Sequence, residues 1–203
     1  MRDWPSRPIP RYDSAVFLDR DGTINIDTDH PHRIAELQFV PGALEALKVA
    51  AELPAHVIVV SNQSGIEKGL YDTGQMSEFN RELRVRVEYA GGRIDAFYFC
   101  PHVAAKDLRP GAQACSCSKP SPGMILDAAN DFGLKDLESS FMVGDKTSDI
   151  VAGKRSKCTT ILVRTGKKSR EGGALTVRPD HVAEDITEAV AIIAESHTTE
   201  APE

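Results

Sequence analysis

The chain has 203 residues and a formal net charge of −6, with 24 Lys and Arg residues against 30 Asp and Glu residues. No run of Lys and Arg is long enough to coat a nucleic-acid backbone, and no apolar segment is long enough to span a bilayer. This length suits one full-sized core, so residues 1–203 are predicted to form a single domain with no nucleic-acid or membrane partner.

The two ends of the chain are polar. Residues 1–11 are rich in Pro and Arg and have no apolar centre, so they are predicted to be neither a signal peptide nor a transit helix. The cytoplasm is therefore the expected location, with the four cysteines as thiols rather than disulfides. Residues 1–11 and 197–203 are predicted to be flexible ends.

The first predicted strand is the apolar run 15–18, which leads into Asp19-Arg20-Asp21-Gly22-Thr23. Side chains on a strand alternate between its faces, so Asp19 and Asp21 are predicted to point to one place beyond the strand's carboxyl end. Open α/β sheets bind ligands at that end, and two close carboxylates suit a hard cation such as Mg²⁺. An Asx-rich turn without a metal is the alternative.

The remaining predicted elements alternate between strands and helices. Apolar and β-branched runs predict strands at residues 56–60, 95–99, 141–144, 159–163 and 181–182. Helical spacing and capping residues predict helices between Pro41-Gly42 and Pro54, and at residues 75–90, 123–132, 147–155 and 186–195. The first helix is predicted to present Leu44, Leu47 and Ala51 on one face. Gly133 and Asp185 are predicted to cap later helices.

This alternation predicts the fold class. Strands that look buried on both faces, separated by helices, indicate an α/β fold with a Rossmann-like, mostly parallel sheet covered by helices on both sides. The stretch 25–40 and the loop after Gly65 are too short for a cap domain. Loops are therefore expected to shape the pocket.

Polar groups follow three of the predicted strands: Asp19 with Asp21, Ser61 with Asn62, and Asp145 with Lys146. A parallel sheet brings these strand ends together, and Lys119 lies just before a predicted helix where it can join them. Carboxylates, a hydroxyl and ammonium groups in one place suit phosphoryl transfer, in which a carboxylate can act as nucleophile. Structural alternatives remain: Ser61 can cap a turn, Lys119 can lie on the surface and Asp145 can cap the next helix.

A second constellation comprises Cys100-Pro101-His102 and Cys115-Ser116-Cys117. Cys100, His102, Cys115 and Cys117 supply the four ligands of a closed, structural zinc site. Bound zinc would order the irregular stretch 100–122 and fix Lys119. Free thiols or a redox pair are the alternatives, although the Cys-x-Cys spacing suits a metal better than a strained disulfide. Cys158 stands apart and is predicted to be a small core residue.

The acidic motifs resemble a known pattern. Asp19-x-Asp21-Gly22-Thr23, Ser61, Lys119 and Gly144-Asp145 with Asp149 resemble, in order and strand-end placement, the four motifs of the haloacid dehalogenase (HAD) superfamily. This resemblance covers nearly all of the chain and implies a HAD fold. It implies that Asp19 is the nucleophile and that Asp21 is the general acid and then the base.

The HAD resemblance also implies the metal and phosphoryl contacts. Asp19, Asp145 and the backbone carbonyl of Asp21 would form the Mg²⁺ site, and Ser61 and Lys119 would hold the transferring phosphoryl group. ATP-driven pumps of this superfamily have Thr in place of the second Asp, so Asp21 favours a phosphatase. The role of Asp149 stays open between orienting Lys146 and orienting the water shell of the metal.

The cysteine motif narrows the resemblance. Cys-Pro-His, a loop and Cys-x-Cys-x-Lys-Pro-x-Pro-Gly-Met resemble the D-glycero-D-manno-heptose 1,7-bisphosphate phosphatases. The stretches 17–25, 62–66, 143–146 and 162–167 agree with that family as well. The resemblance implies removal of the 7-phosphate in the synthesis of nucleotide-activated heptose. Histidinol-phosphate phosphatases, which share the zinc loop, and other small sugar-phosphate phosphatases are the alternatives.

The same resemblance implies substrate contacts from the stretch Asp27 to His30, from Asn62, Gln63 and Ser64, and from Ser118 and Lys146. The family usually has Arg at the position of Ser118, and Ser lacks the planar guanidinium that could bind a second phosphate. Either binding of that phosphate is expected to be weaker, or Arg164 or Lys168 is expected to supply the charge instead. The sequence leaves the anomer and the exact sugar open.

One alternative belongs to another functional class, a zinc-stabilised binding protein on a disabled phosphatase scaffold. The presence of Asp19, Asp21, Lys119 and Asp145 argues against it. Glycine-loop nucleotide binding is disfavoured because neither G-x-x-x-x-G-K-[ST] nor G-x-G-x-x-G occurs. The expected partner is a small phosphorylated sugar. A monomer is expected because the predicted helix 75–90 has no apolar stripe beyond one core contact.

Overall fold

The computed structural model describes residues 2–3, 9, 11–103, 115–135, 137–166 and 177–199. Within these ranges seven strands form one sheet in the order β1-β4-β3-β2-β5-β6-β7. The strands are β1 (Arg2–Asp3), β2 (Ala15–Leu18), β3 (His56–Asn62), β4 (Ala96–Cys100), β5 (Phe141–Gly144), β6 (Thr159–Val163) and β7 (His181–Ala183). The pairs are parallel except for β1 with β4, which is antiparallel.

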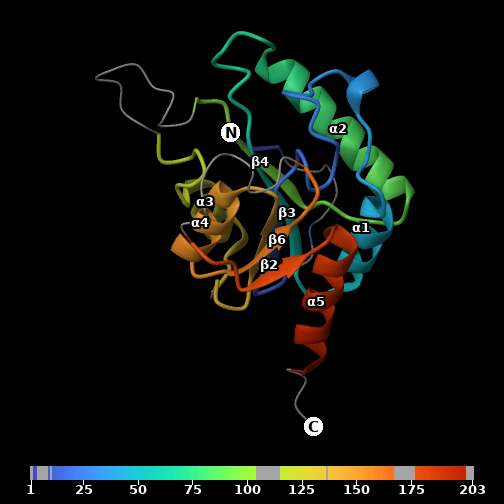
Figure 1. Ribbon diagram of the computed structural model, residues 1–203, viewed down its shortest axis with the longest axis vertical. Helices are drawn as coiled ribbons and strands as arrows, with labels where there is room; N and C mark the ends of the chain where they lie inside the picture. Colours follow the sequence, from blue (N-terminus) through green and yellow to red (C-terminus); the bar gives the residue numbers. More distant parts are fainter. Residues whose placement is uncertain are drawn as a thin grey trace.

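Helices cover both faces of this sheet. They are α1 (Ala43–Glu52), α2 (Thr73–Tyr89), α3 (Gly123–Phe132), α4 (Thr147–Arg155) and α5 (Ile186–Thr199), with a short 3-10 helix η1 (Ile34–Glu36). Figure 1 shows α3 and α4 on one side of the sheet and α1, α2 and α5 on the other. The predicted α/β architecture, with a mostly parallel sheet covered on both faces, is confirmed.

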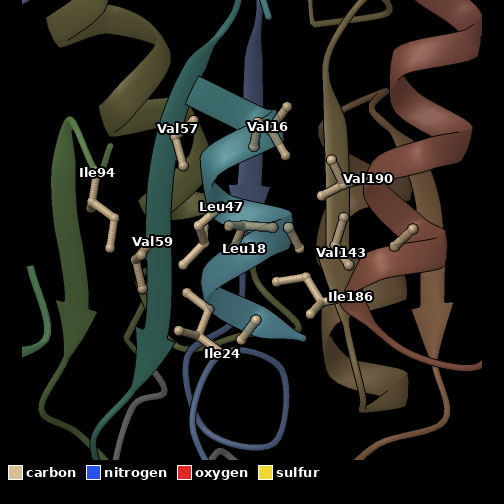
Figure 2. Packing of buried hydrophobic residues seen from close by; sticks show 14 of the residues in the cluster. Val16, Leu18, Ile24, Leu47, Val57, Val59, Ile94, Val143, Ile186 and Val190 are labelled. Carbon is tan, nitrogen blue, oxygen red and sulfur yellow. The ribbon is translucent and has the colours of Figure 1, made fainter. Parts of the chain in front are cut away.

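The strand residues alternate between two cores, as the period of a strand requires. Val16 and Leu18 of β2 pack in a cluster with residues of α1, α2 and α5, whereas Ala15 and Phe17 pack in a second cluster with residues of α3 and α4. Figure 2 shows Leu47 of α1 over the strands of the first cluster. All four β2 residues are fully buried, which explains their continuous apolar sequence.

Most predicted elements are confirmed, with shifted ends. α3, α4, β5 and β6 have the predicted bounds, Gly133 caps α3 with a φ of 66°, and the Asp185 side chain accepts hydrogen bonds from the first amides of α5. β3 is two residues longer than predicted, so Ser61 and Asn62 are its last residues rather than the start of a loop. α2 begins earlier because Asp72 and Gln75 form a capping box.

The ends of the chain were predicted to be flexible, which stays a prediction; within them, Arg2 and Asp3 form β1, where Asp3 accepts a hydrogen bond from Arg84, and α5 extends to residue 199. The predicted buried face of α1 was wrong in part. α1 buries Ala43, Ala46, Leu47 and Ala50, whereas Leu44 and Ala51 are only half-buried. The buried face of α1 is therefore rotated from the predicted face, and α5 packs against this helix.

The connections beside the predicted active edge are short. The chain between β2 and α1 contains only η1, and the connection between β3 and α2 contains no helix or strand. The structure thus shows no cap inserted at either point. In the described part of the chain, no helix has both the length and the apolar character that a bilayer span requires.

Candidate active site

The predicted polar residues converge at the carboxyl ends of the central strands. β2 lies between β3 and β5 in the sheet, so Asp19, Ser61 and Asp145 come from three neighbouring strand ends. A cavity of about 30 Å³ lies there, lined by Asp19, Asp21, Ser61, Asn62, Lys119, Lys146, Ser148 and Asp149. This is the edge at which open parallel sheets bind ligands.

Lys119 is buried at the centre of this site. Its Nζ donates to Asp19 Oδ1 and to the backbone carbonyl of Val60, both at 2.7 Å, and lies 2.7 Å from Asp149 Oδ1. Burial alone would lower the pKa of Lys119, but the charges of Asp149 and Asp19 raise it above its usual value. The lysine is therefore a fixed cation directly beside the predicted nucleophile.

Asn62 holds the backbone of Lys119 in place. Its side-chain amide donates to the Lys119 carbonyl and its side-chain oxygen accepts from the Lys119 amide, both at 2.9 Å. Asn62 was predicted to contact substrate, and it does line the cavity. The structure adds that this residue joins the end of β3 to the segment that delivers the lysine.

The surroundings of Asp19, the predicted nucleophile, favour its charged form. Its carboxylate is buried, which would raise its pKa, but Lys119 and Lys146 lower the pKa below the usual value. Its backbone amide donates to the Val143 carbonyl at 2.9 Å, which fixes the chain just after β2. Asp19 is therefore held as a charged carboxylate facing the cavity.

Asp19, Asp145 and Asp149 form the acidic cluster of the site. One carboxylate oxygen from each lies within 4.8 Å of the others, and all three residues are buried. Gly22 has a φ of 94°, and a Cβ at that position would lie 2.7 Å from Asp145 Oδ2. Glycine thus allows the backbone after Asp21 to pass directly beside Asp145.

Lys146 closes the other side of this cluster. Its Nζ lies 3.4 Å from the Asp21 carbonyl, 3.4 Å from Asp27 Oδ2 and 3.7 Å from Asp145 Oδ1. Burial opposes its charge, but the neighbouring carboxylates, Asp19 first among them, raise the pKa of Lys146. The predicted substrate residues Lys146 and Asp27 are thus brought together beside the cavity.

Asp21 was predicted to act as acid and base. Its carboxylate accepts hydrogen bonds from both nitrogens of an Arg20 fork, from Asn25 and from Gln63, at 2.9 to 3.0 Å. This carboxylate is not one of the three in the acidic cluster, and the backbone carbonyl of Asp21 lies 3.4 Å from Lys146 Nζ. The separate roles of the Asp21 side chain and carbonyl stay predictions.

The predicted zinc ligands are also brought together. Cys100, His102, Cys115 and Cys117 each place a ligand atom within 4.8 Å of the others. The three sulfur atoms are 2.9 to 3.4 Å apart, and His102 Nδ1 lies 3.5 Å from Cys100 Sγ. Three thiols and one imidazole converging on a point fit a tetrahedral zinc ion. Cys158 is buried in the second core, as predicted. Burial raises the pKa of its thiol to about 12, which favours the neutral form.

The other described residues predicted to contact substrate do not line this cavity. Ser64 is half-buried in the turn after β3, and His30 Nε2 lies 3.2 Å from Lys68 Nζ. Ser118 is buried, and its hydroxyl donates to the Lys119 carbonyl at 3.4 Å, so it supports the local turn. Arg164 is mostly exposed and forms an ion pair with Glu184. Lys168 lies outside the described residues.

Sequence reasoning missed Arg20 and Tyr71 and left Asp149 unassigned. Arg20 is fully buried, holds Asp21 and also donates to Asn80 of α2. Tyr71 donates to Gln63, which in turn donates to Asp21. Asp149 follows Asp145 by one helical turn, a spacing that was visible in the sequence, but its pairing with Lys119 depends on how distant segments pack.

This topology, with an acidic cavity and a buried lysine at the ends of its central strands, defines a HAD-like hydrolase. A family model described as HAD-hydrolase-like matches residues 116–189. More specifically, the chain belongs to the D-glycero-beta-D-manno-heptose-1,7-bisphosphate 7-phosphatase family. It is 40% identical to the member from Photorhabdus laumondii over 154 residues, which cover 75% of this chain and 81% of the relative. It is also 40% identical to the member from Pasteurella multocida over 78% of this chain and 86% of the relative.

Solved structures support this assignment. The D,D-heptose 1,7-bisphosphate phosphatase of B. bronchiseptica, crystallised with magnesium and phosphate, has a TM-score of 0.78 and 30% identity, with 90% of this chain and 99% of that chain covered. The corresponding phosphatase of Burkholderia thailandensis has a TM-score of 0.65 and 26% identity over 89% of this chain and 98% of that chain. The predicted superfamily and family resemblances are confirmed.

Proposed function

We propose that this protein is a Mg²⁺-dependent phosphatase that removes the 7-phosphate of D-glycero-β-D-manno-heptose 1,7-bisphosphate. The observation that carries the proposal is the Lys119 ammonium, held 2.7 Å from both Asp19 and Asp149 inside a cavity at the strand ends. The names of relatives at 40% identity support the substrate and favour the β anomer. They also favour the heptose substrate over histidinol phosphate.

The donor set fits a magnesium ion. Asp19, Asp145 and the carbonyl of Asp21 offer hard oxygen ligands in one place, and carboxylates are the groups by which Mg²⁺ is usually held. The similar B. bronchiseptica enzyme was crystallised with magnesium and phosphate. When bound here, Mg²⁺ would offset the negative charge of the phosphoryl oxygens.

The chain's own residues account for the two chemical steps. In the first, an Asp19 oxygen attacks phosphorus, the bond from phosphorus to the sugar oxygen breaks, and Asp21 gives that oxygen a proton. In the second, water attacks the aspartyl-phosphate, Asp21 takes the proton of the water, and Asp19 leaves as a carboxylate. Lys119 and the Ser61 hydroxyl hold the phosphoryl oxygens through both steps.

The remaining substrate contacts are proposed around the same cavity. Asp27, His30, Asn62, Ser64 and Lys146 would contact the sugar and its phosphates, whereas Gln63, which was also predicted to contact substrate, is buried and hydrogen-bonds to Asp21 and Ser61 instead. Ser118 is turned toward the Lys119 carbonyl, and Arg164 is paired with Glu184, so we do not assign the distal phosphate to either side chain. We propose that His30 and Lys68, whose side-chain nitrogens lie 3.2 Å apart, bind that phosphate.

Further proposals concern the protein as a whole. Zinc bound by the cysteine and histidine cluster would be structural, because four protein ligands leave no open position. We propose that residues 1–203 form a single catalytic domain that works as a monomer in the cytoplasm, where thiols stay reduced. The intact acidic residues and lysine of the cavity support an enzyme rather than a disabled binding scaffold.

Phosphate release from a panel of sugar phosphates tests this function. With Mg²⁺, the heptose 1,7-bisphosphate should be hydrolysed far faster than histidinol phosphate or hexose bisphosphates, with one phosphate released per sugar and the 1-phosphate retained. Asp19→Asn should lower kcat by at least about 10³-fold, because it removes the nucleophile. Equal turnover of unrelated phosphate esters would contradict the heptose assignment, and an inactive wild-type protein would favour the binding scaffold.

A further inference from the structure

Behind the cavity, Gln63 connects two functional side chains. It is buried, and its side-chain nitrogen donates to Asp21 Oδ2 at 2.9 Å and to Ser61 Oγ at 2.7 Å. Because a carboxamide nitrogen carries two hydrogens, both bonds can exist at once. Gln63 therefore contacts the residue that exchanges protons and the hydroxyl that holds the phosphoryl group.

The carboxamide of Gln63 is itself held by Tyr71. The Tyr71 hydroxyl donates to Gln63 Oε1 at 2.7 Å, which leaves the nitrogen end facing Asp21 and Ser61. Burial raises the pKa of Tyr71 to about 12, so this hydroxyl keeps its proton at neutral pH. Hydrogen bonding thus runs in one direction, from Tyr71 through Gln63 to the cavity.

The orientation of the Gln63 carboxamide limits where Ser61 can donate its hydroxyl hydrogen. Since Gln63 donates to Ser61 Oγ, the hydroxyl hydrogen of Ser61 cannot point back along that bond and must donate elsewhere. Ser61 lines the cavity, so the hydrogen is available for a phosphoryl oxygen. A carboxamide turned the other way would place its oxygen against the Asp21 carboxylate and would compete for this hydrogen.

The surroundings of Tyr71 keep its ring in one position. Tyr71 packs in a small buried cluster with Met76, Phe99 and Ile66, and the His32 ring stacks on it at a centroid distance of 4.6 Å and an angle of 14°. The backbone of Gly65 lies so close that a Cβ there would be 2.2 Å from Tyr71 Cε1. Such packing fixes the hydroxyl in space, as a positioning group requires.

We propose that Tyr71 is a positioning residue of the phosphatase, acting through Gln63 to align Asp21 for proton transfer and Ser61 for phosphoryl binding. Tyr71 does not line the cavity, so its effect is on geometry rather than on the reacting atoms. The inference rests on the proposed phosphatase activity, but it does not depend on which sugar is the substrate.

The test compares Tyr71→Phe with Tyr98→Phe in the magnesium-loaded protein. Both changes remove one buried tyrosine hydroxyl, but the Tyr98 hydroxyl donates to Asp131, away from the cavity. We expect Tyr71→Phe to lower kcat by about 10-fold, a part of what general acid–base catalysis contributes, with KM changed by less than about 3-fold. Tyr98→Phe should leave kcat within about 2-fold of the wild type.

A double-mutant cycle with Gln63→Leu shows whether the effect passes through Gln63. Gln63→Leu alone should lower kcat at least as much as Tyr71→Phe, and adding Tyr71→Phe to it should cause less than about a further 2-fold loss. Additive losses, an unchanged kcat in either single variant, or an equal loss in Tyr98→Phe would each overturn the proposal. If Tyr71→Phe does not fold, the Gln63→Leu result decides.

The same measurements with p-nitrophenyl phosphate separate this inference from the proposed substrate. If the wild type hydrolyses this ester but not the heptose bisphosphate, the substrate assignment fails and the Tyr71 comparison still stands. A wild-type protein inactive toward both esters would overturn both. An active wild type with a Tyr71→Phe variant of equal kcat would overturn only the role of Tyr71.

Discussion

At the scale of single residues, the position of the Lys119 ammonium depends on three partners. Asp19 directly follows β2 and Val60 lies on the neighbouring strand β3, whereas Asp149 belongs to α4. Asp149 also accepts a hydrogen bond from the Lys146 amide at 3.0 Å, which fixes its own side chain. This carboxylate therefore helps to locate the lysine relative to Asp19, the proposed nucleophile.

We expect Asp149→Asn to lower kcat by roughly 10- to 100-fold, because a neutral amide attracts the lysine less and the lysine would be less well aligned with the phosphoryl group. Steady-state kinetics with the wild type in parallel measure this. Asp127→Asn, an exposed position on α3, is the matched control and should keep full activity. A kcat within 2-fold of the wild type in Asp149→Asn would show that Asp19 and Val60 suffice.

At the scale of elements, the cysteine and histidine cluster ties β4 to α3. Cys100 is the last residue of β4, and Cys117 is two residues before Lys119. The amide of Gly123, the first residue of α3, donates to the Ser116 carbonyl at 3.2 Å. The segment that carries Lys119 into the site is thus anchored at the cluster on one side and at the start of a helix on the other.

Loss of zinc from this cluster should make both the position of Lys119 and the loop that joins Cys100 to Cys117 less well ordered. We expect purified wild-type protein to contain one zinc ion per chain, and Cys115→Ser to lose it, with a melting temperature lower by roughly 5–10 °C and a reduced kcat. Metal analysis and thermal unfolding measure these quantities. Cys158→Ala, which removes a thiol from the core, should retain its zinc. Zinc retained in Cys115→Ser would contradict the assigned ligand set.

At the scale of the whole molecule, two apolar cores on opposite faces of one sheet hold the site in place. The larger core joins β2 and its neighbours to α1, α2 and α5, and Leu47 of α1 lies fully buried within it (Figure 2). The proposed catalytic groups lie just beyond the carboxyl ends of the same strands. The core therefore sets the spacing of the strand ends, and the strand ends set the spacing of these groups.

We expect Leu47→Ala to lower the free energy of unfolding by about 3 kcal/mol, through lost burial and the cavity left behind. Val49→Ala on the exposed side of α1 should change it by less than about 0.5 kcal/mol. Denaturant unfolding followed by circular dichroism measures both values. The KM of Leu47→Ala should stay close to that of the wild type, because Leu47 lies away from the cavity; a large rise in KM would show that this core repacks the site.

The elements were largely predictable because their signals are local. A few consecutive residues were enough to predict β2, which is a continuous apolar run, and β5, which ends in Gly144 before Asp145. The exact face of α1 was not predictable, because packing against α5, more than a hundred residues later, decides which side is covered. β1 was not predicted for the same reason, since its two residues form a strand only because β4 lies beside them.

By itself, the sequence determined which groups gather at the strand ends: the acidic pair after β2, the hydroxyl of Ser61, Lys119 and the acid after β5. It also determined which cysteine and histidine side chains come together, because their chemistry and their spacing in two short pairs are visible in the sequence. Only the tertiary structure decided how these groups are held. The hydrogen bond from Arg20 to Asn80, the pairing of Asp149 with Lys119 and the support of Gln63 by Tyr71 join segments whose contact depends on packing. A buried polar group forms its hydrogen bond with whichever group the fold places beside it, and that group can be far away in the sequence, so the local sequence does not predict it.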